Sequence, residues 1–283
     1  MPFWLSISIL GLVQAALVAL PAPRERPQWI GRLSSPRWAL VPALSIVVVV
    51  GAIEASPGSA DALTYIALVA IPPLAAYALA TLTRVRENPP YARVLADSRN
   101  GGSGWLMPAS VVTALFVVAW AAAGSLLGEA AAMVLSGLAC VTLGWLLVWG
   151  VPAYWLRIGI YAMAAIDTWF VASDLLQGPN AVLSAAAPVA DLPRLQAVHF
   201  GSALMGFGDL FVAALVGCLL ARDRPRQLEA ALLVAILALA FDLLFFAVDT
   251  LPATVPVALA LAIVHWRASA DRAGGDQVAR GPG

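Results

Sequence analysis

The chain has 283 residues, of which 61% are apolar and 11% are charged, and its mean hydropathy is +0.88. Soluble domains carry about 25% charged residues, so this composition excludes a soluble globular domain and indicates a polytopic membrane protein. The formal net charge is zero and there is no lysine. No basic run is present, which argues against a nucleic-acid partner.

Nine apolar segments are long enough to predict membrane-spanning helices, which need about 20 apolar residues each. In chain order they are 3–20, 38–53, 62–82, 105–124, 130–149, 154–176, 195–221, 228–248 and 251–266. The first lacks the basic leader of a signal peptide and is expected to be retained as a helix. The predicted fold is therefore all-α, with nine transmembrane helices.

The arginines predict the orientation of these helices. Those at 24–37, 84–99, 157, 222–226 and 267–280 all fall on one side of a nine-span chain, and only Arg194 falls on the other. Basic loops face the cytoplasm. The pattern predicts an outside N-terminus and a cytoplasmic C-terminus, and the Arg-rich, Lys-free composition points to the plasma (inner) membrane of a bacterium.

Two acids fall inside predicted spans, Asp167 in 154–176 and Asp209 in 195–221. A carboxylate at mid-membrane depth costs roughly 2.5–3.5 kcal/mol, so each is a candidate functional residue. Asp167 follows Arg157 by about 15 Å of helix and Asp209 precedes Arg222 by about 20 Å, so both can lie at a similar depth. Two adjacent carboxyls in a low dielectric share a proton and can act as general base and general acid.

The buried acids and the two cysteines also allow structural interpretations. Buried acids also occur in helix–helix contacts and in proton or ion relays, and both interpretations stay open from the acids alone. Asp242, in segment 228–248, has two interpretations. It is either a hydrogen-bonded acid that faces the bundle or a third acid in the cavity that alters the proton affinity of the pair. Cys140 and Cys218 lie in apolar segments and are read as small packing residues, with a disulfide left open.

Three motifs follow one another in the last part of the chain. Asp167-Thr-Trp-Phe-Val lies in the sixth segment, Gly206-Phe207-Gly208-Asp209 in the seventh, and Leu251-Pro252-Ala253-Thr254 opens the ninth. Their order and placement resemble the presenilin/signal peptide peptidase family of intramembrane aspartyl proteases. The resemblance covers about the last 120 residues. Ile166 stands where the family has Tyr, and Thr254 where its Pro-Ala-Leu motif has Leu.

The resemblance implies a role for each motif. Asp167 and Asp209 would be the catalytic pair, and Gly206, Phe207 and Gly208 would let an unwound substrate backbone approach. Pro252, Ala253 and Thr254 would shape the floor of the cleft. Residues 1–150 would form a scaffold half, 151–267 the catalytic half, and 268–283 a disordered cytoplasmic tail.

The expected function is hydrolysis of peptide bonds within transmembrane segments or signal peptides, in the type II orientation, without metal or cofactor. Its partners would be these substrates and the lipid bilayer. A prepilin-peptidase-like enzyme also uses a GxGD acid, but such enzymes place their first acid near the cytoplasmic surface. A transporter or proton relay built on the same acids is a further alternative, as is a family member without activity.

Overall fold

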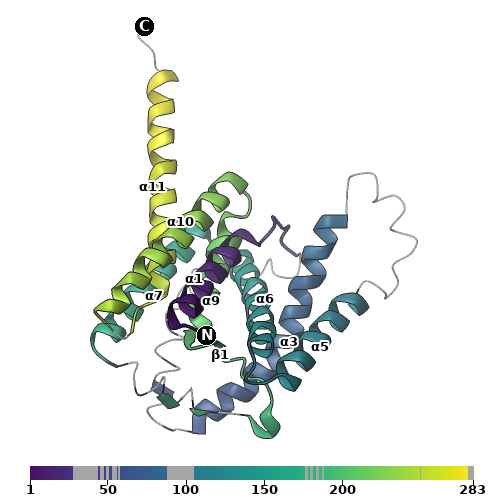
Figure 1. Cartoon of the computed structure of the whole chain (residues 1–283). Helices are drawn as coiled ribbons and strands as arrows, with labels where there is room; N and C mark the ends of the chain where they lie inside the picture. Colours follow the sequence, from purple (N-terminus) through teal and green to yellow (C-terminus); the bar gives the residue numbers. More distant parts are fainter. Residues whose placement is uncertain are drawn as a thin grey trace, which may run out of the picture.

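The computed structural model describes residues 1–27, 58–87, 105–175, 188–248 and 250–279, together with scattered positions at 44–56 and 178–186. These residues form a mostly helical protein with eight α-helices and one β-hairpin (Figure 1). The helices are α1 (Phe3–Ala19), α3 (Gly58–Glu87), α5 (Leu106–Ala121), α6 (Leu126–Gly150), α7 (Ala153–Ala172), α9 (Phe207–Leu220), α10 (Arg224–Asp242) and α11 (Thr254–Ala279). Short 3-10 turns occupy Val189–Asp191 and Leu243–Phe246.

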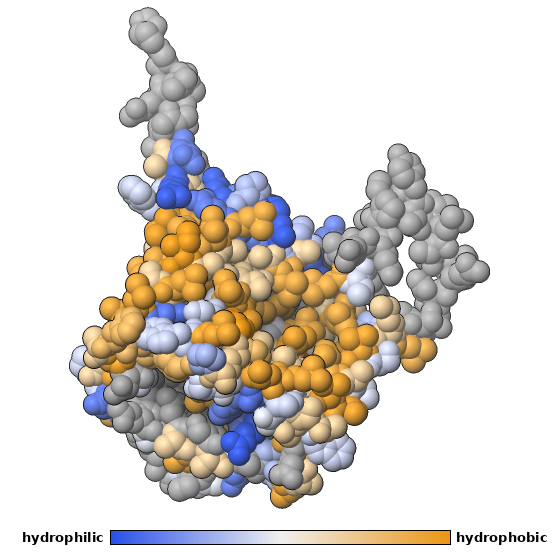
Figure 2. All heavy atoms as spheres, viewed as in Figure 1, coloured by the Kyte–Doolittle hydropathy of each residue, from blue (hydrophilic) through white to orange (hydrophobic). Residues whose placement is uncertain are grey.

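Eight of the nine apolar segments contain one of these helices, and segment 38–53 lies almost wholly outside the described residues. Within the described part of the chain, three helices are long and apolar enough to cross a membrane: Gly58–Thr83, Leu126–Gly150 and Arg224–Phe246. On the face shown in Figure 2, apolar residues cover much of the middle of the molecule, hydrophilic residues gather above them, and the lower end is mixed. The structure is thus compatible with a membrane protein.

The prediction of one continuous helix over 195–221 is wrong. Residues Ala197–Phe200 and Ala203–Gly206 form strands β1 and β2, which pair antiparallel, and α9 starts only at Phe207. Gly201 has φ +62° at the first central position of the turn, which type II′ hairpins reserve for glycine. A short apolar run is compatible with either a strand or a helix, so hydropathy alone could not separate them.

The turn of this hairpin is fixed from two sides. The carboxylate of Glu129 on α6 accepts a hydrogen bond of 2.7 Å from the backbone N–H of Gly201, and Ser6 Oγ on α1 accepts one of 3.3 Å from Ser202. A Cβ on Gly201 would lie 2.5 Å from Ser6 Oγ. These contacts satisfy backbone groups that an apolar setting would leave unpaired.

Helices α1, α6 and α9 form the centre of the core. Small residues allow the close approach: a Cβ on Gly217 of α9 would lie 2.5 Å from the carbonyl oxygen of Val18 on α1, and one on Gly144 of α6 would lie 3.0 Å from Cys218 Sγ. Cys140 and Cys218 are both buried and unbridged, which confirms the packing interpretation.

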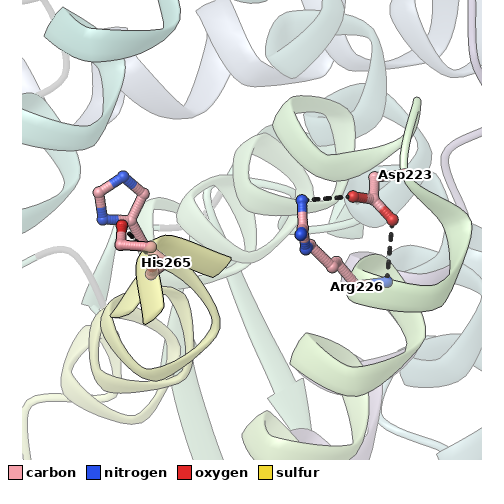
Figure 3. Close-up of polar contacts among 4 residues, drawn as sticks. Asp223, Arg226 and His265 are labelled. Carbon is pink, nitrogen blue, oxygen red and sulfur yellow. Dashed lines mark hydrogen bonds and ion pairs between the residues drawn. The ribbon is translucent and has the colours of Figure 1, made fainter. Parts of the chain in front are cut away.

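Helix α10 begins with a polar cap. The carboxylate of Asp223 accepts hydrogen bonds from the backbone N–H of Arg226 (3.4 Å) and from its guanidinium (2.8 Å), as Figure 3 shows. Gln227, the fourth residue of α10, is fully buried. Its Nε2 donates to the carbonyls of Val18 (2.9 Å), Pro21 (2.8 Å) and Gly217 (3.2 Å). These hydrogen bonds connect the start of α10 to the C-terminal end of α1 and to α9.

Helix α11 extends past the other helices to Ala279 (Figure 1). Residues 268–279 are therefore helical, and the prediction of a disordered tail from residue 268 is wrong for this part. Alanine and arginine in this stretch are strong helix formers, and their polar neighbours do not prevent a helix that continues from an apolar one. Residues 280–283 lie outside the described part of the chain.

Candidate functional site

Asp209 lies in the first turn of α9, directly after strand β2. Gly206, the N-cap residue, has extended φ/ψ, and its backbone N–H donates to Asp209 Oδ2 at 3.1 Å. The start of a helix carries partial positive charge, which favours an acidic side chain there. The acid therefore sits at a strand-to-helix junction rather than in the middle of the continuous helix that was expected.

Asp167 lies on α7, one and a half turns before that helix ends at Ala172. Its Oδ2 accepts a hydrogen bond of 2.6 Å from Oγ1 of Thr254, the first residue of α11. Thr254 is only 1% exposed. A residue of the third sequence motif is thus hydrogen-bonded to one of the two acids.

The carboxyl groups of Asp167 and Asp209 lie close enough for the charge of one to act on the other. Met163 precedes Asp167 by one turn on the same face of α7, and a Cβ on Gly208 would lie 3.3 Å from its Cε. Gly208 therefore lets α9 approach the acid-bearing face of α7. The structure brings together both acids, from segments separated by the hairpin.

Gly206 has a second role beside its hydrogen bond. A Cβ at this position would lie 3.1 Å from Oδ2 of Asp209. A side chain here would press on the carboxylate, so glycine keeps Asp209 in place by leaving space as well as by donating its N–H.

The other predicted site residues lie around this centre. Pro252 is buried, and its carbonyl accepts a hydrogen bond from the N–H of Val255 at 3.2 Å. Phe207 is partly buried against the core, and the thiol of Cys140 lies 3.9 Å from its carbonyl oxygen. The carbonyl of Ala253 accepts a hydrogen bond of 3.0 Å from Nε2 of Gln14 on α1.

Gln14 was not identified from the sequence. It is 1% exposed, in a helix that is otherwise almost entirely apolar. The signal that could have found it is the cost of a polar side chain in an apolar span, which applies to amides as well as to acids.

Asp242, at the end of α10, is partly buried, and its Oδ2 has no hydrogen-bond partner among the described residues. The expectation of a hydrogen-bonded acid fails for this atom. Within the described part of the chain, no group of three His, Cys, Asp or Glu side chains could hold a metal ion.

The chemistry available at this site is that of two carboxyls at the meeting point of α7, α9 and α11, with a hydroxyl donor on one and an amide donor on the other. Two carboxyls so placed can exchange protons with a bound water and a carbonyl group. Comparison with protein-family models, curated proteins and solved structures gave no match.

Proposed function

We propose that this protein is an intramembrane aspartyl protease of the presenilin/signal peptide peptidase type. The observation that carries the proposal is the convergence of Asp167 and Asp209 from α7 and α9, with Thr254 of the third motif bonded to Asp167. Three motifs spread between residues 167 and 254 contribute to one place, which a chance GxGD string would not produce.

The helix directions support a membrane-spanning arrangement with the expected number of crossings. Helices α1, α3, α6 and α9 run parallel, as the first, third, fifth and seventh of nine spans would, and α10 runs antiparallel to α1. The contacts that set these directions are Ser6 with Ser202, Val18 with Gly217, Cys140 with Phe207, Gly144 with Cys218, Leu74 with Thr142, Tyr77 with Trp149, and Val18 with Gln227.

Because α1 and α3 are parallel, the chain leaves α1 at one end of the bundle and re-enters α3 at the other. The crossing predicted from the sequence at 38–53, almost wholly outside the described residues, would meet this requirement. We therefore propose nine spans in the inner membrane of a bacterium, with the arginine-rich end cytoplasmic and the N-terminus outside.

Hydrolysis needs only the two acids and water. One carboxylate takes a proton from water as the oxygen attacks the peptide carbonyl carbon, and the other carboxyl protonates the carbonyl oxygen. The resulting gem-diol collapses as the leaving nitrogen gains a proton and the C–N bond breaks, giving a free acid and an amine. The two acids titrate as a pair, so the roles belong to the pair rather than to one residue.

The hairpin supplies a route for an unwound substrate. Helical peptide bonds are shielded, so a substrate has to open locally before attack, and an extended segment can add to a sheet edge. Strand β2 ends three residues before Asp209, and within the described residues the sheet contains only β1 and β2. A segment paired along β2 would run toward the acids.

The test is cleavage of a type II transmembrane peptide by the purified protein in lipid vesicles. We expect Asp167→Asn and Asp209→Asn each to lower kcat by at least about 100-fold. Asp242→Asn is the matched control, because it makes the same change at a partly buried acid outside the site. Equal loss in all three variants would indicate general destabilisation and contradict the assignment of the pair.

The same vesicles distinguish the other candidate functions. Proton-coupled uptake without cleavage, abolished by either Asn variant, would replace the protease with a relay or transporter. Cleavage only at the cytoplasmic border of the peptide, found by mass spectrometry of the products, would favour a prepilin-peptidase-like enzyme. Mapping the C-terminus to the outside would overturn the proposed topology and the type II preference.

A further inference from the structure

Gln14 makes a tertiary contact with the third motif. Its side chain is buried in α1, where an amide without a hydrogen-bond partner would be destabilising. Its Nε2 donates at 3.0 Å to the carbonyl of Ala253, 239 residues away. The amide is thus held against the chain just before α11.

The accepting carbonyl belongs to the peptide group that leads into Thr254. Peptide groups are planar, so holding the Ala253 carbonyl oxygen fixes the orientation of the plane whose next atom pair is the N and Cα of Thr254. Thr254 Oγ1 in turn donates to Asp167 Oδ2 at 2.6 Å. One rigid peptide unit therefore separates the Gln14 contact from the residue that touches the acid.

Two prolines flank the start of α11. Pro252 and Pro256 have no N–H to donate, and α11 starts between them at Thr254. Besides the internal hydrogen bonds of α11, the Pro252 carbonyl accepts a backbone bond from Val255 N–H at 3.2 Å. The Gln14 amide adds a contact from another helix at this first turn of α11.

We propose that Gln14 is a positioning residue for the acid pair: by holding the Ala253 carbonyl it sets the hydrogen bond from Thr254 to Asp167. This rests on the proposed function and assigns part of the site to α1, outside the 151–267 region expected to be catalytic. Gln14 touches neither acid, and acts through Ala253 and Thr254.

Gln227 provides a matched control. It is also fully buried, and it also joins α1 to another part of the chain by donating to carbonyls, those of Val18, Pro21 and Gly217. Its contacts lie at the opposite end of α9 from Asp209. Gln→Met keeps the length of the side chain and removes the donor, so the same substitution can be made at both positions.

The first readout is the pH dependence of cleavage. A hydrogen bond donated to a carboxylate favours its charged form, so Thr254→Val should move the acidic limb of the pH–kcat profile to higher pH. We expect kcat to fall about tenfold in Thr254→Val and about threefold in Gln14→Met, because each variant loses one hydrogen bond, worth about 1 kcal/mol net. KM should change little in both variants. Gln14→Met should shift the limb in the same direction, and Gln227→Met should leave it in place.

The second readout does not depend on activity. The carboxyl-stretch infrared band of ¹³C-Asp-labelled protein, assigned to Asp167 by its loss in Asp167→Asn, should shift in Thr254→Val and partly shift in Gln14→Met. An unchanged band in Gln14→Met, or an equal shift in Gln227→Met, would overturn the positioning role even if the protein cleaves peptides. A shifted band in a protein that cleaves nothing would keep the positioning role and remove the protease.

Discussion

The two ends of helix α9 are packed by different means. At its C-terminal end, a Cβ on Gly217 would meet backbone atoms of α1: the carbonyl oxygens of Val18 and Leu17 lie 2.5 and 2.7 Å from that position. At its N-terminal end, a Cβ on Gly208 would meet only the terminal methyl of Met163, at 3.3 Å. The C-terminal end of α9, which packs backbone against backbone, is called the closed end below. The N-terminal end, which carries Asp209 and contacts a flexible side chain, is called the acid end.

The polar contacts follow the same division. At the closed end, Gln227 donates to three carbonyls and accepts from Arg224 at 2.8 Å. At the acid end, the carboxyl of Asp167 accepts from Thr254 and that of Asp209 accepts from the backbone N–H of Gly206. The polar contacts at the closed end join three segments through backbone carbonyls, whereas those at the acid end are donated to the two carboxyls.

The largest effect on stability is expected from Gly217→Ala. The added methyl would collide with the backbone of α1, which cannot move without separating the two helices, so we expect a loss of about 3 kcal/mol or more. Thermal unfolding in detergent measures this as a large fall in Tm. An unchanged Tm would show that the two helices are not in backbone contact.

Gln227→Met comes next. It removes one amide donor shared by three buried carbonyls and leaves them unpaired, and we expect a loss of about 2 kcal/mol. The fall in Tm should be accompanied by normal kcat per folded molecule. A selective loss of kcat would mean that the closed end also shapes the site.

Gly208→Ala should give the opposite pattern, with a cost of about 1 kcal/mol or less in stability and a loss of about tenfold in cleavage. The flexible end of Met163 can move away from the new methyl, so the stability cost is small. Moving Met163 changes the packing between α9 and the face of α7 that carries Asp167, so activity should fall more. Gly137→Ala is the control, because Gly137 lies on α6, which carries neither acid, and its Cβ would meet another flexible group, Leu17 Cδ2, at 3.2 Å. Equal loss of activity in both would contradict a special role for Gly208.

The smallest expected effect is a gain. Asp242→Leu removes a buried carboxyl oxygen that has no hydrogen-bond partner among the described residues, and we expect stability to rise by about 1 kcal/mol with cleavage unchanged. A fall in activity at unchanged Tm would instead assign Asp242 as a third acid acting on the pair.

The sequence alone determined the hydrophobic character of the chain, the positions of most helices and the candidate acids. Apolar runs report burial, and carboxyls inside them are costly enough to stand out. The glycines next to Asp209 were also visible, because the GxGD spacing is local. The helix limits of α6 and α7 lie within four residues of the predicted segments.

The tertiary structure decided what local pattern could not. The hairpin at 197–206 arises where a glycine turn is anchored by Glu129 and Ser6, and hydropathy does not distinguish such a strand from a helix. The contact of Thr254 with Asp167, and of Gln14 with Ala253, joins residues 87 and 239 positions apart. A hydrogen bond needs its two atoms within about 3 Å, and for residues this distant in sequence only the packing of whole helices can bring that about.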